Sequence, residues 1–171
     1  MFYSPKPDKK GAVTAVSLIL LSAVVSAMSR TVPQAGGIFN VAAALVITAA
    51  LFITIRFVIS GYVYEITSDS LVVTKITGQR KTTVASLSLS EGVGVAARPK
   101  TAEERAAFLA RFGKTDARMN FCRNLFAKSY VFVSYFNGKK YEILLETDEE
   151  FAKYLENAVI AARNLRDDEN E

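Results

Sequence analysis

Few side chains in this sequence could do chemistry, and none stands in a catalytic arrangement. The chain has no histidine, which removes the commonest general base and the commonest metal ligand. Its single cysteine, Cys122, has neither a histidine nor a second cysteine beside it, so we interpret it as a small buried apolar residue. The adjacent carboxylates Glu149 and Glu150 fit the start of a helix better than an acid–base pair.

The glycines do not form a phosphate-binding loop either. Gly92 and Gly94 lack the further glycine spacing, the lysine and the following helix that such a loop requires. We therefore predict that the protein is not an enzyme and that it has no catalytic residue, no metal site and no cofactor.

Basic residues are the remaining candidates for function. Eight basic residues against three acidic ones lie between Arg98 and Lys128. Near an anionic leaflet each lysine or arginine contributes about 1 kcal/mol of binding, and Phe108 and Phe112 could insert beside the charges. The alternative is that both rings pack on the domain and the charges are a solvated face. The candidate lipid- or partner-binding residues are Arg98, Lys100, Arg105, Phe108, Arg111, Phe112, Lys114 and Arg118.

The charge of the chain is unevenly distributed along its length. From Glu142 to Glu171 there are ten acidic residues against three basic ones, opposite in sign to the segment before it. The net charge of +4 is therefore a poor guide to partners. We expect no nucleic-acid partner, because a nearby anionic phospholipid surface is the simpler counterpart of the basic segment.

Two apolar runs fill the first third of the chain, at residues 12–29 and 38–60. Each is about as long as a helix that spans a ~30 Å hydrocarbon core at ~1.5 Å per residue. Arg56 is the only charged residue in either run. Unpaired backbone amides are costly in hydrocarbon, so both runs should be helical, and the short loop with Pro33, Gly36 and Gly37 favours a tight hairpin. We predict a transmembrane helical hairpin over residues 1–60.

The flanking charges predict the orientation of this hairpin. Lys6, Lys9 and Lys10 precede the first run, whereas the loop between the runs carries only Arg30. The positive-inside rule then places both termini in the cytoplasm, and the lipid bilayer is the expected partner of the hairpin. Four aromatic residues are placed to act as interfacial anchors: Phe2, Tyr3, Tyr62 and Tyr64.

A cleaved signal peptide is the alternative interpretation of the first run. Lys9 and Lys10 would form its basic region, and Val25-Ser26-Ala27 would supply a small-residue cleavage site. The length of the run and the second run that follows almost at once both favour the hairpin.

Residues 61–165 alternate and turn as a single domain of strands and helices. Strands are expected over residues 61–67, 71–77 and 81–89, followed by a bend or bulge at Gly92 and Gly94. Leu125 and Phe126 suggest a brief strand. The clearest feature is a hairpin of residues 130–136 and 140–147, because Asn137-Gly138 between them is the strongest short hairpin signal.

Two helices are expected in the same domain. Thr101 with Glu104 forms a capping-box pattern that opens a short helix ending at Gly113, within a basic insertion over residues 98–128. A second capping box at Thr147 opens the last helix, before an acidic tail at residues 166–171 that we expect to be disordered from Asp167. The apolar face of this last helix comprises Phe151, Tyr154, Leu155, Ala158, Val159 and Ala162.

The pattern of strands and turns resembles that of bacterial PH-like domains. The run Tyr64-Glu-Ile-Thr-Ser-Asp-Ser-Leu-Val-Val is similar to the opening of such domains, and the late hairpin with its following Asp-Glu-Glu-Phe helix start is similar to their end. The basic insertion departs from the pattern. The resemblance implies a membrane-anchored α+β protein, with the helical hairpin followed by an antiparallel PH-like β-barrel or sheet and a C-terminal α-helix.

The function expected from this organisation is binding. The leading hypothesis is a non-catalytic, membrane-anchored PH-like module that recruits or scaffolds a protein partner at the inner membrane. The first alternative is a module that docks on anionic lipid through the basic insertion. The second is an accessory subunit of a membrane enzyme or transporter whose active parts lie in another chain, which co-purification of a stoichiometric partner would reveal.

Overall fold

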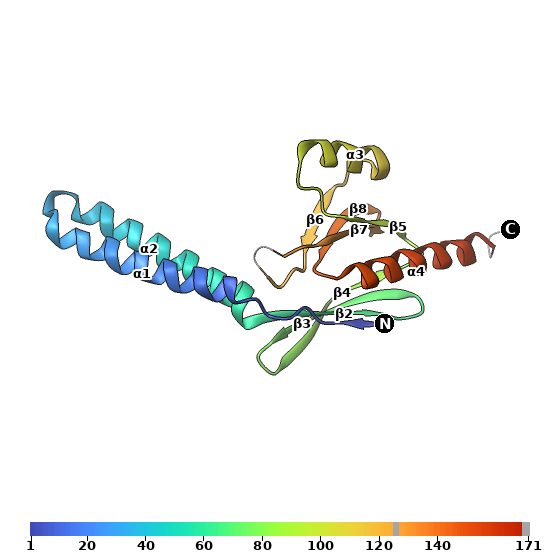
Figure 1. The fold of residues 1–171 in the computed structure, drawn as a ribbon, viewed down its shortest axis with the longest axis horizontal. Helices are drawn as coiled ribbons and strands as arrows, with labels where there is room; N and C mark the ends of the chain where they lie inside the picture. The colour runs from blue at the N-terminus through green and yellow to red at the C-terminus, as the bar shows by residue number, and fades with distance from the viewer. Residues whose placement is uncertain (125–126, 169–171) are drawn as a thin grey trace. The chain divides into compact units, whose positions relative to one another are not determined.

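A computed structural model describes residues 1–124 and 127–168 as two compact units (Figure 1). One unit comprises residues 6–61 together with Asn124, and the other comprises Met1–Pro5 and the described residues from Tyr62 onward, Asn124 excepted. The first five residues therefore belong with the β-rich domain and not with the helices, which differs from the division at residue 60 expected from the sequence.

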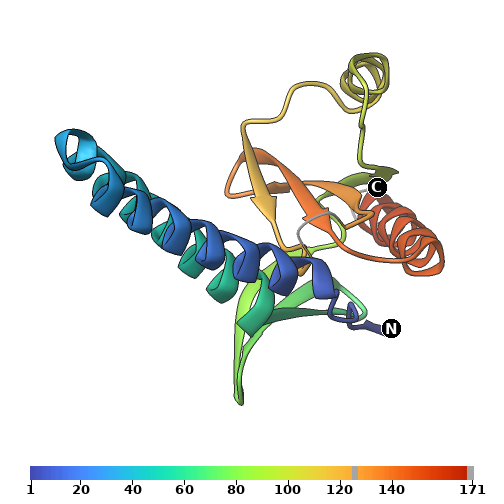
Figure 2. The same ribbon diagram turned by 60° about the vertical axis from the view of Figure 1, so that its left-hand side comes forward.

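The helical unit is a hairpin of two long helices. Helix α1 (Lys9–Thr31) is joined by a 3₁₀ turn η1 (Pro33–Ala35) to α2 (Gly36–Ile53), which continues as a π-helical turn η2 (Thr54–Ile59). The two helices lie side by side (Figures 1 and 2). Small residues permit this close approach, since the buried Ser22 hydroxyl donates to the Ala43 carbonyl at 3.1 Å.

Most of the apolar surface of this hairpin faces outward. Only 17% of the apolar window of α1 and 11% of that of the second helical segment are buried. Both helices are long and apolar enough to cross a membrane. The core helix of a soluble domain would instead bury its apolar face.

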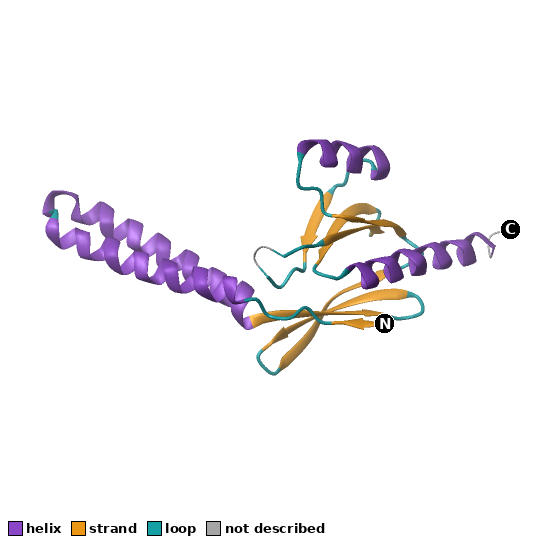
Figure 3. Ribbon diagram, in the orientation of Figure 1, coloured by secondary structure: helices purple, strands orange, loops and turns teal. Residues whose placement is uncertain are grey.

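The other unit contains two four-stranded sheets in its described residues (Figure 3). The first sheet has the order β1-β2-β3-β4, with β1 (Phe2–Tyr3), β2 (Ser60–Ile66), β3 (Ser70–Thr77) and β4 (Arg80–Ser88). The second has the order β5-β7-β8-β6, with β5 (Gly92–Ala97), β6 (Ala117–Asn120), β7 (Tyr130–Phe136) and β8 (Lys139–Leu145). Helix α3 (Ala102–Phe112) lies between β5 and β6 in the chain, and α4 (Glu149–Asp168) follows β8. The layout is α+β, as the sequence predicted, but the second sheet is not purely antiparallel as expected, because β6 pairs in parallel with β8.

The main core of this unit is formed by both sheets and one face of α4. Tyr64, Leu71, Phe132 and Ile143 contribute from the strands, and Phe151 contributes from α4; all five are fully buried. Complete burial of such apolar side chains stabilises a fold by about 1.5–3 kcal/mol each.

Two expectations about aromatic residues are wrong because this core recruits them differently. Tyr62 and Tyr64 do not serve as interfacial anchors, since they are 6% and 0% exposed within the domain core. Tyr154 is 48% exposed and lies off the buried face of α4, which is formed by Phe151, Ala152, Leu155 and Val159.

The predicted turns are confirmed by the backbone geometry. Asn137 and Gly138 have φ of 50° and 73°, as a type I′ turn requires between β7 and β8. The register of β5 against β7 shifts between Gly92 and Gly94, which is the expected bulge. A Cβ at Gly92 would lie 2.8 Å from a methyl group of Val159, so only glycine fits there without a shift.

Strand β6 was not predicted from the sequence, and helix α4 begins and ends at other residues than expected. Strand β6 pairs in parallel with β8 and has no strong alternation of its own, and the suggested strand at Leu125 and Phe126 falls outside the described residues. Helix α4 is capped by Asp148, whose carboxylate accepts from the Phe151 amide at 2.8 Å, and not by Thr147. The helix also continues to Asp168, past the expected start of the tail.

Candidate functional site

Helix α3 is held by the predicted capping box. The Thr101 hydroxyl accepts from the Glu104 amide at 3.1 Å, and the Glu104 carboxylate accepts from the amides of Lys100 and Thr101 at 2.6 and 3.3 Å. These backbone donors hold the pKa of Glu104 below its usual value. Gly113 ends the helix at a φ of 73°, a conformation that favours glycine.

The inner face of α3 packs on the second sheet. Phe108 and Phe112 are 5% and 4% exposed and pack against Val131 and Val133 of β7, with the two ring centroids 4.9 Å apart. The rings are therefore not available for insertion into a bilayer in this conformation. The structure instead favours the alternative in which they pack on the domain.

Three of the candidate basic residues form ion pairs with acidic residues of the same domain. Arg105 and Arg118 lie 2.8 and 3.7 Å from the two oxygens of Glu142, a carboxylate on β8 that is 2% exposed. Arg111 lies 3.1 Å from Glu156 of α4. Part of the charge contrast between the two sequence segments is thus neutralised within the fold.

A groove of about 520 Å³ runs beside α3, where the helix faces the end of β5 and the start of β7. We call it the α3 groove. Its apolar lining comes from Ala96, Ala97, Pro99, Ala107, Phe108 and Phe112. Its charged lining comes from Arg98, Lys100, Glu104, Arg111 and Lys128.

The structure thus brings together some of the predicted site residues and separates others. Arg98, Lys100, Phe108, Arg111 and Phe112 line the α3 groove, whereas Arg105, Lys114 and Arg118 are absent from its lining. Arg105 and Arg118 instead hold α3 and β6 to Glu142.

Lys128 lines the groove but is not among the residues that the sequence analysis singled out. It reaches this place because β7 pairs with β5: Ala97 lies opposite Tyr130, and the Arg98 amide donates to the Ser129 carbonyl at 3.0 Å. The predicted strand that begins at Tyr130 could have pointed to Lys128, because Lys128 lies just before it in the chain. The strand with which it pairs could not be predicted from the sequence.

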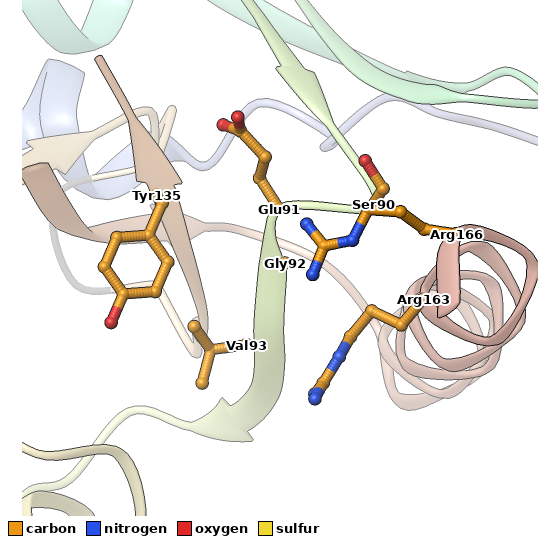
Figure 4. Close-up of a pocket in the computed structure, with 7 residues that line it drawn as sticks. All are labelled: Ser90, Glu91, Gly92, Val93, Tyr135, Arg163 and Arg166. Atoms are coloured by element: carbon orange, nitrogen blue, oxygen red, sulfur yellow. The ribbon is translucent and has the colours of Figure 1, made fainter. Parts of the chain in front are cut away.

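A second pocket, of about 330 Å³, lies between the start of β5 and the last turns of α4 (Figure 4). Arg163 and Arg166 extend from α4 on one side, and Val93 and Tyr135 line the other side. No pattern in the sequence pointed to this pocket, because its residues come from three separate elements.

Tyr64, a titratable group with a strongly shifted pKa, has a structural role. Burial raises the pKa of Tyr64, whose hydroxyl donates to the Phe121 carbonyl at 2.8 Å and accepts from the Glu146 amide at 3.2 Å. Cys122 is 4% exposed. Among the described residues, no group of three histidine, cysteine, aspartate or glutamate side chains could hold a metal ion.

Comparison with known proteins agrees with this arrangement of sheets and helices. No curated protein and no solved structure matches the chain. A family model described as a bacterial PH-like domain (DUF6106) matches residues 4–162, which include the helical hairpin and strands β2 to β8 but not β1. PH-like domains are generally non-catalytic modules. The chain therefore belongs to this family of bacterial PH-like domains.

Proposed function

We propose that this protein is a membrane-anchored, non-catalytic PH-like module that recruits or scaffolds a protein partner at the inner membrane. The α3 groove carries the proposal, because it combines an apolar floor with basic side chains at its edge. Concave apolar sites with a few well-placed polar groups are the usual form of a binding site.

The outward-facing apolar surface of the helical hairpin supports the anchor. Ile38 and Leu45 of α2 are 74% and 67% exposed, which in water would be a large unpaired apolar surface. Two membrane-spanning helices would cover this surface with lipid.

Strand β1 supports the proposed topology. Tyr3 pairs with Tyr64 of β2, and the N-terminal amino group donates to the Ile66 carbonyl at 2.8 Å. The chain therefore leaves the β-rich domain into α1 and re-enters it after η2. If both helices span the bilayer, both termini lie on one side, and the lysines before α1 favour the cytoplasm.

The same pairing opposes removal of the first run as a signal peptide. Cleavage after Ala27 would delete β1 and leave β2 with an exposed edge.

Cytoplasmic placement predicts that reporter fusions to the C-terminus and to the η1 turn report opposite sides of the membrane. Fusions that place the C-terminus outside the cell would contradict it.

Docking on anionic lipid is a second candidate function, favoured by one observation. Arg98, Lys100 and Lys128 converge at the α3 groove from two separate chain segments, and basic clusters near an anionic leaflet bind it. An accessory role beside a membrane enzyme or transporter is a special case of partner recruitment.

In-cell photocrosslinking tests the recruitment function. A photoreactive amino acid placed at Ala107 in the full chain is expected to form one discrete adduct with a protein in native membranes. The matched position is Lys81, an exposed residue on β4 of the other sheet. Identical adduct patterns at both positions, or adducts only to lipid at Ala107, would count against recruitment through this groove.

A further inference from the structure

We infer that the α3 groove binds a protein segment in which acidic residues flank an apolar side chain. This inference rests on the proposed recruitment function and names the chemistry of the partner. It follows from three properties of the groove: its floor is apolar, the side chains at its edge are mostly basic, and its surface is concave.

The floor of the groove is apolar and is preformed. Ala96 and Ala97 of β5 lie on one side, and Ala107 of α3 lies on the other, so the side chains at this place are short. Phe108 and Phe112 close the bottom and are fixed by their packing on β7. A partner side chain that enters such a space buries apolar area without first ordering the site.

The basic side chains at the edge divide into one that forms an ion pair within 4.0 Å and three that do not. Arg111 already forms its ion pair with Glu156. Within residues 1–124 and 127–168, Arg98, Lys100 and Lys128 make no ion pair at 4.0 Å or less. These three cations, at the edge of an apolar floor, complement carboxylates that flank an apolar side chain.

The surroundings favour a protein segment over the surface of a bilayer. Glu104, in the first turn of α3, lines the same groove, and an anionic leaflet would repel its carboxylate. Neither phenylalanine is exposed to insert into lipid. A flat, uniformly anionic surface would therefore face Glu104 as well as the cations and could not enter the concave apolar floor. A peptide can place its apolar side chain on the floor and its carboxylates beside the cations, away from Glu104.

Selection from a random nonapeptide display library tests the inference. The full chain in nanodiscs of phosphatidylcholine serves as the target, and Ala107→Trp serves as the counter-target because its ring would fill the floor. Ala106→Trp is the matched control, since Ala106 is an exposed neighbour on α3 that does not line the groove. We expect the selected peptides to bind the wild type and Ala106→Trp, and to be enriched in aspartate or glutamate beside an apolar residue.

Charge reversal then tests the role of the cations. The fluorescein-labelled leading peptide should bind Lys100→Glu/Lys128→Glu at least tenfold more weakly than wild type, and its affinity should fall as salt is raised. Arg80→Glu/Lys81→Glu carries the same change of charge on β4 and should bind as wild type does. Circular dichroism of each variant confirms that the fold is retained.

Several results would overturn the inference. Selected peptides that are neutral or basic, no enrichment over Ala107→Trp, or equal loss in both charge-reversal variants would each do so. Binding of soluble dihexanoylphosphatidylglycerol that depends on Lys100 and Lys128, with no enriched peptide, would assign the groove to lipid. A protein adduct at Ala107 that survives Lys100→Glu/Lys128→Glu would refute the acidic partner and leave recruitment standing.

Discussion

The pairing of β1 with β2 makes a prediction about stability that one substitution can test. Tyr3 stacks on Tyr64 with ring centroids 6.3 Å apart and an interplanar angle of 6°, and its ring centroid lies 5.4 Å from that of Phe151. Aromatic pairs contribute about 0.5–1.5 kcal/mol each beyond area burial. Tyr3 is only partly buried, so its replacement should cost less than the ~3–5 kcal/mol of a fully buried aromatic residue. We expect Tyr3→Ala to lower the free energy of unfolding by about 2 kcal/mol.

A soluble form of the domain makes this measurable. The register places Tyr3, at the end of β1, opposite Tyr64 of β2, so a loop of about four residues between Pro5 and Tyr62 could replace residues 6–61. Urea unfolding followed by far-ultraviolet circular dichroism gives the free energy. For a domain of this size, about 2 kcal/mol corresponds to a melting temperature lower by roughly 8 °C.

Phe2→Ala is the matched control for this experiment. Phe2 lies on the same strand but is 65% exposed, so its replacement should change the free energy of unfolding by less than about 0.5 kcal/mol. Tyr3→Phe keeps the ring and should remain close to wild type. If Tyr3→Ala has no more effect than Phe2→Ala, β1 is not part of the domain, and the argument against cleavage of the first helix fails with it.

Four further outcomes are expected in the same soluble form. Arg105→Met should lower the free energy of unfolding by about 1–2 kcal/mol, because it leaves the buried Glu142 carboxylate without its partner at 2.8 Å. Glu142→Leu should lower it less, because the guanidinium groups that it frees are half-exposed. Urea titrations that rank the two variants the other way would contradict this. Thr101→Ala should cost about 1 kcal/mol as a lost helix cap, with helicity read by circular dichroism. The lowered pKa of Glu104 means that its carboxylate stabilises the fold at pH values above the usual carboxyl pKa, and this stabilisation should disappear as the pH falls through the pKa of the folded state. Glu104→Gln should flatten this part of a plot of stability against pH. An unchanged plot would refute this role of Glu104. Gly138→Ala should cost about 1 kcal/mol at its φ of 73°, and an unchanged denaturation midpoint would refute the strain argument.

Local signals in the sequence were sufficient for most individual elements. The capping box at Thr101, the Asn137-Gly138 turn and the bulge at Gly92 each depend on neighbours within a few residues, and each is found where it was predicted. Capping at Asp148 in place of Thr147 shows the limit of such signals. Thr147 is buried and its hydroxyl makes no hydrogen bond with any described residue, whereas Asp148 accepts from the Phe151 amide; which of the two caps the helix is decided by the rest of the fold.

Features that depend on distant pairing could not be predicted from the sequence. Strand β6 is short and has only one partly buried residue, so its pairing with β8 leaves little trace in the alternation of residues. Strand β1 is only two residues long, and the sequence predicted its residues Phe2 and Tyr3 as interfacial anchors and not as a strand. In the candidate site, Lys128 joins Arg98 and Lys100 only through the β5–β7 register.

The distribution of charge along a chain is therefore indirect evidence for its partners. The basic segment suggested an external anion, yet Arg105, Arg118 and Arg111 are matched by Glu142 and Glu156 from the acidic segment. The pair of Arg105 with Glu142 holds α3 on the second sheet. The Glu142 carboxylate is buried, so its ion pairs offset a desolvation cost that the partly exposed arginines do not bear. The charge left for a partner at the α3 groove is mainly that of Arg98, Lys100 and Lys128. If the groove is the binding site, reversing the charge of a paired arginine such as Arg105 should lower the free energy of unfolding more than it lowers the affinity for the partner. Reversing the charge of Lys128 should lower the affinity and leave the free energy of unfolding nearly unchanged.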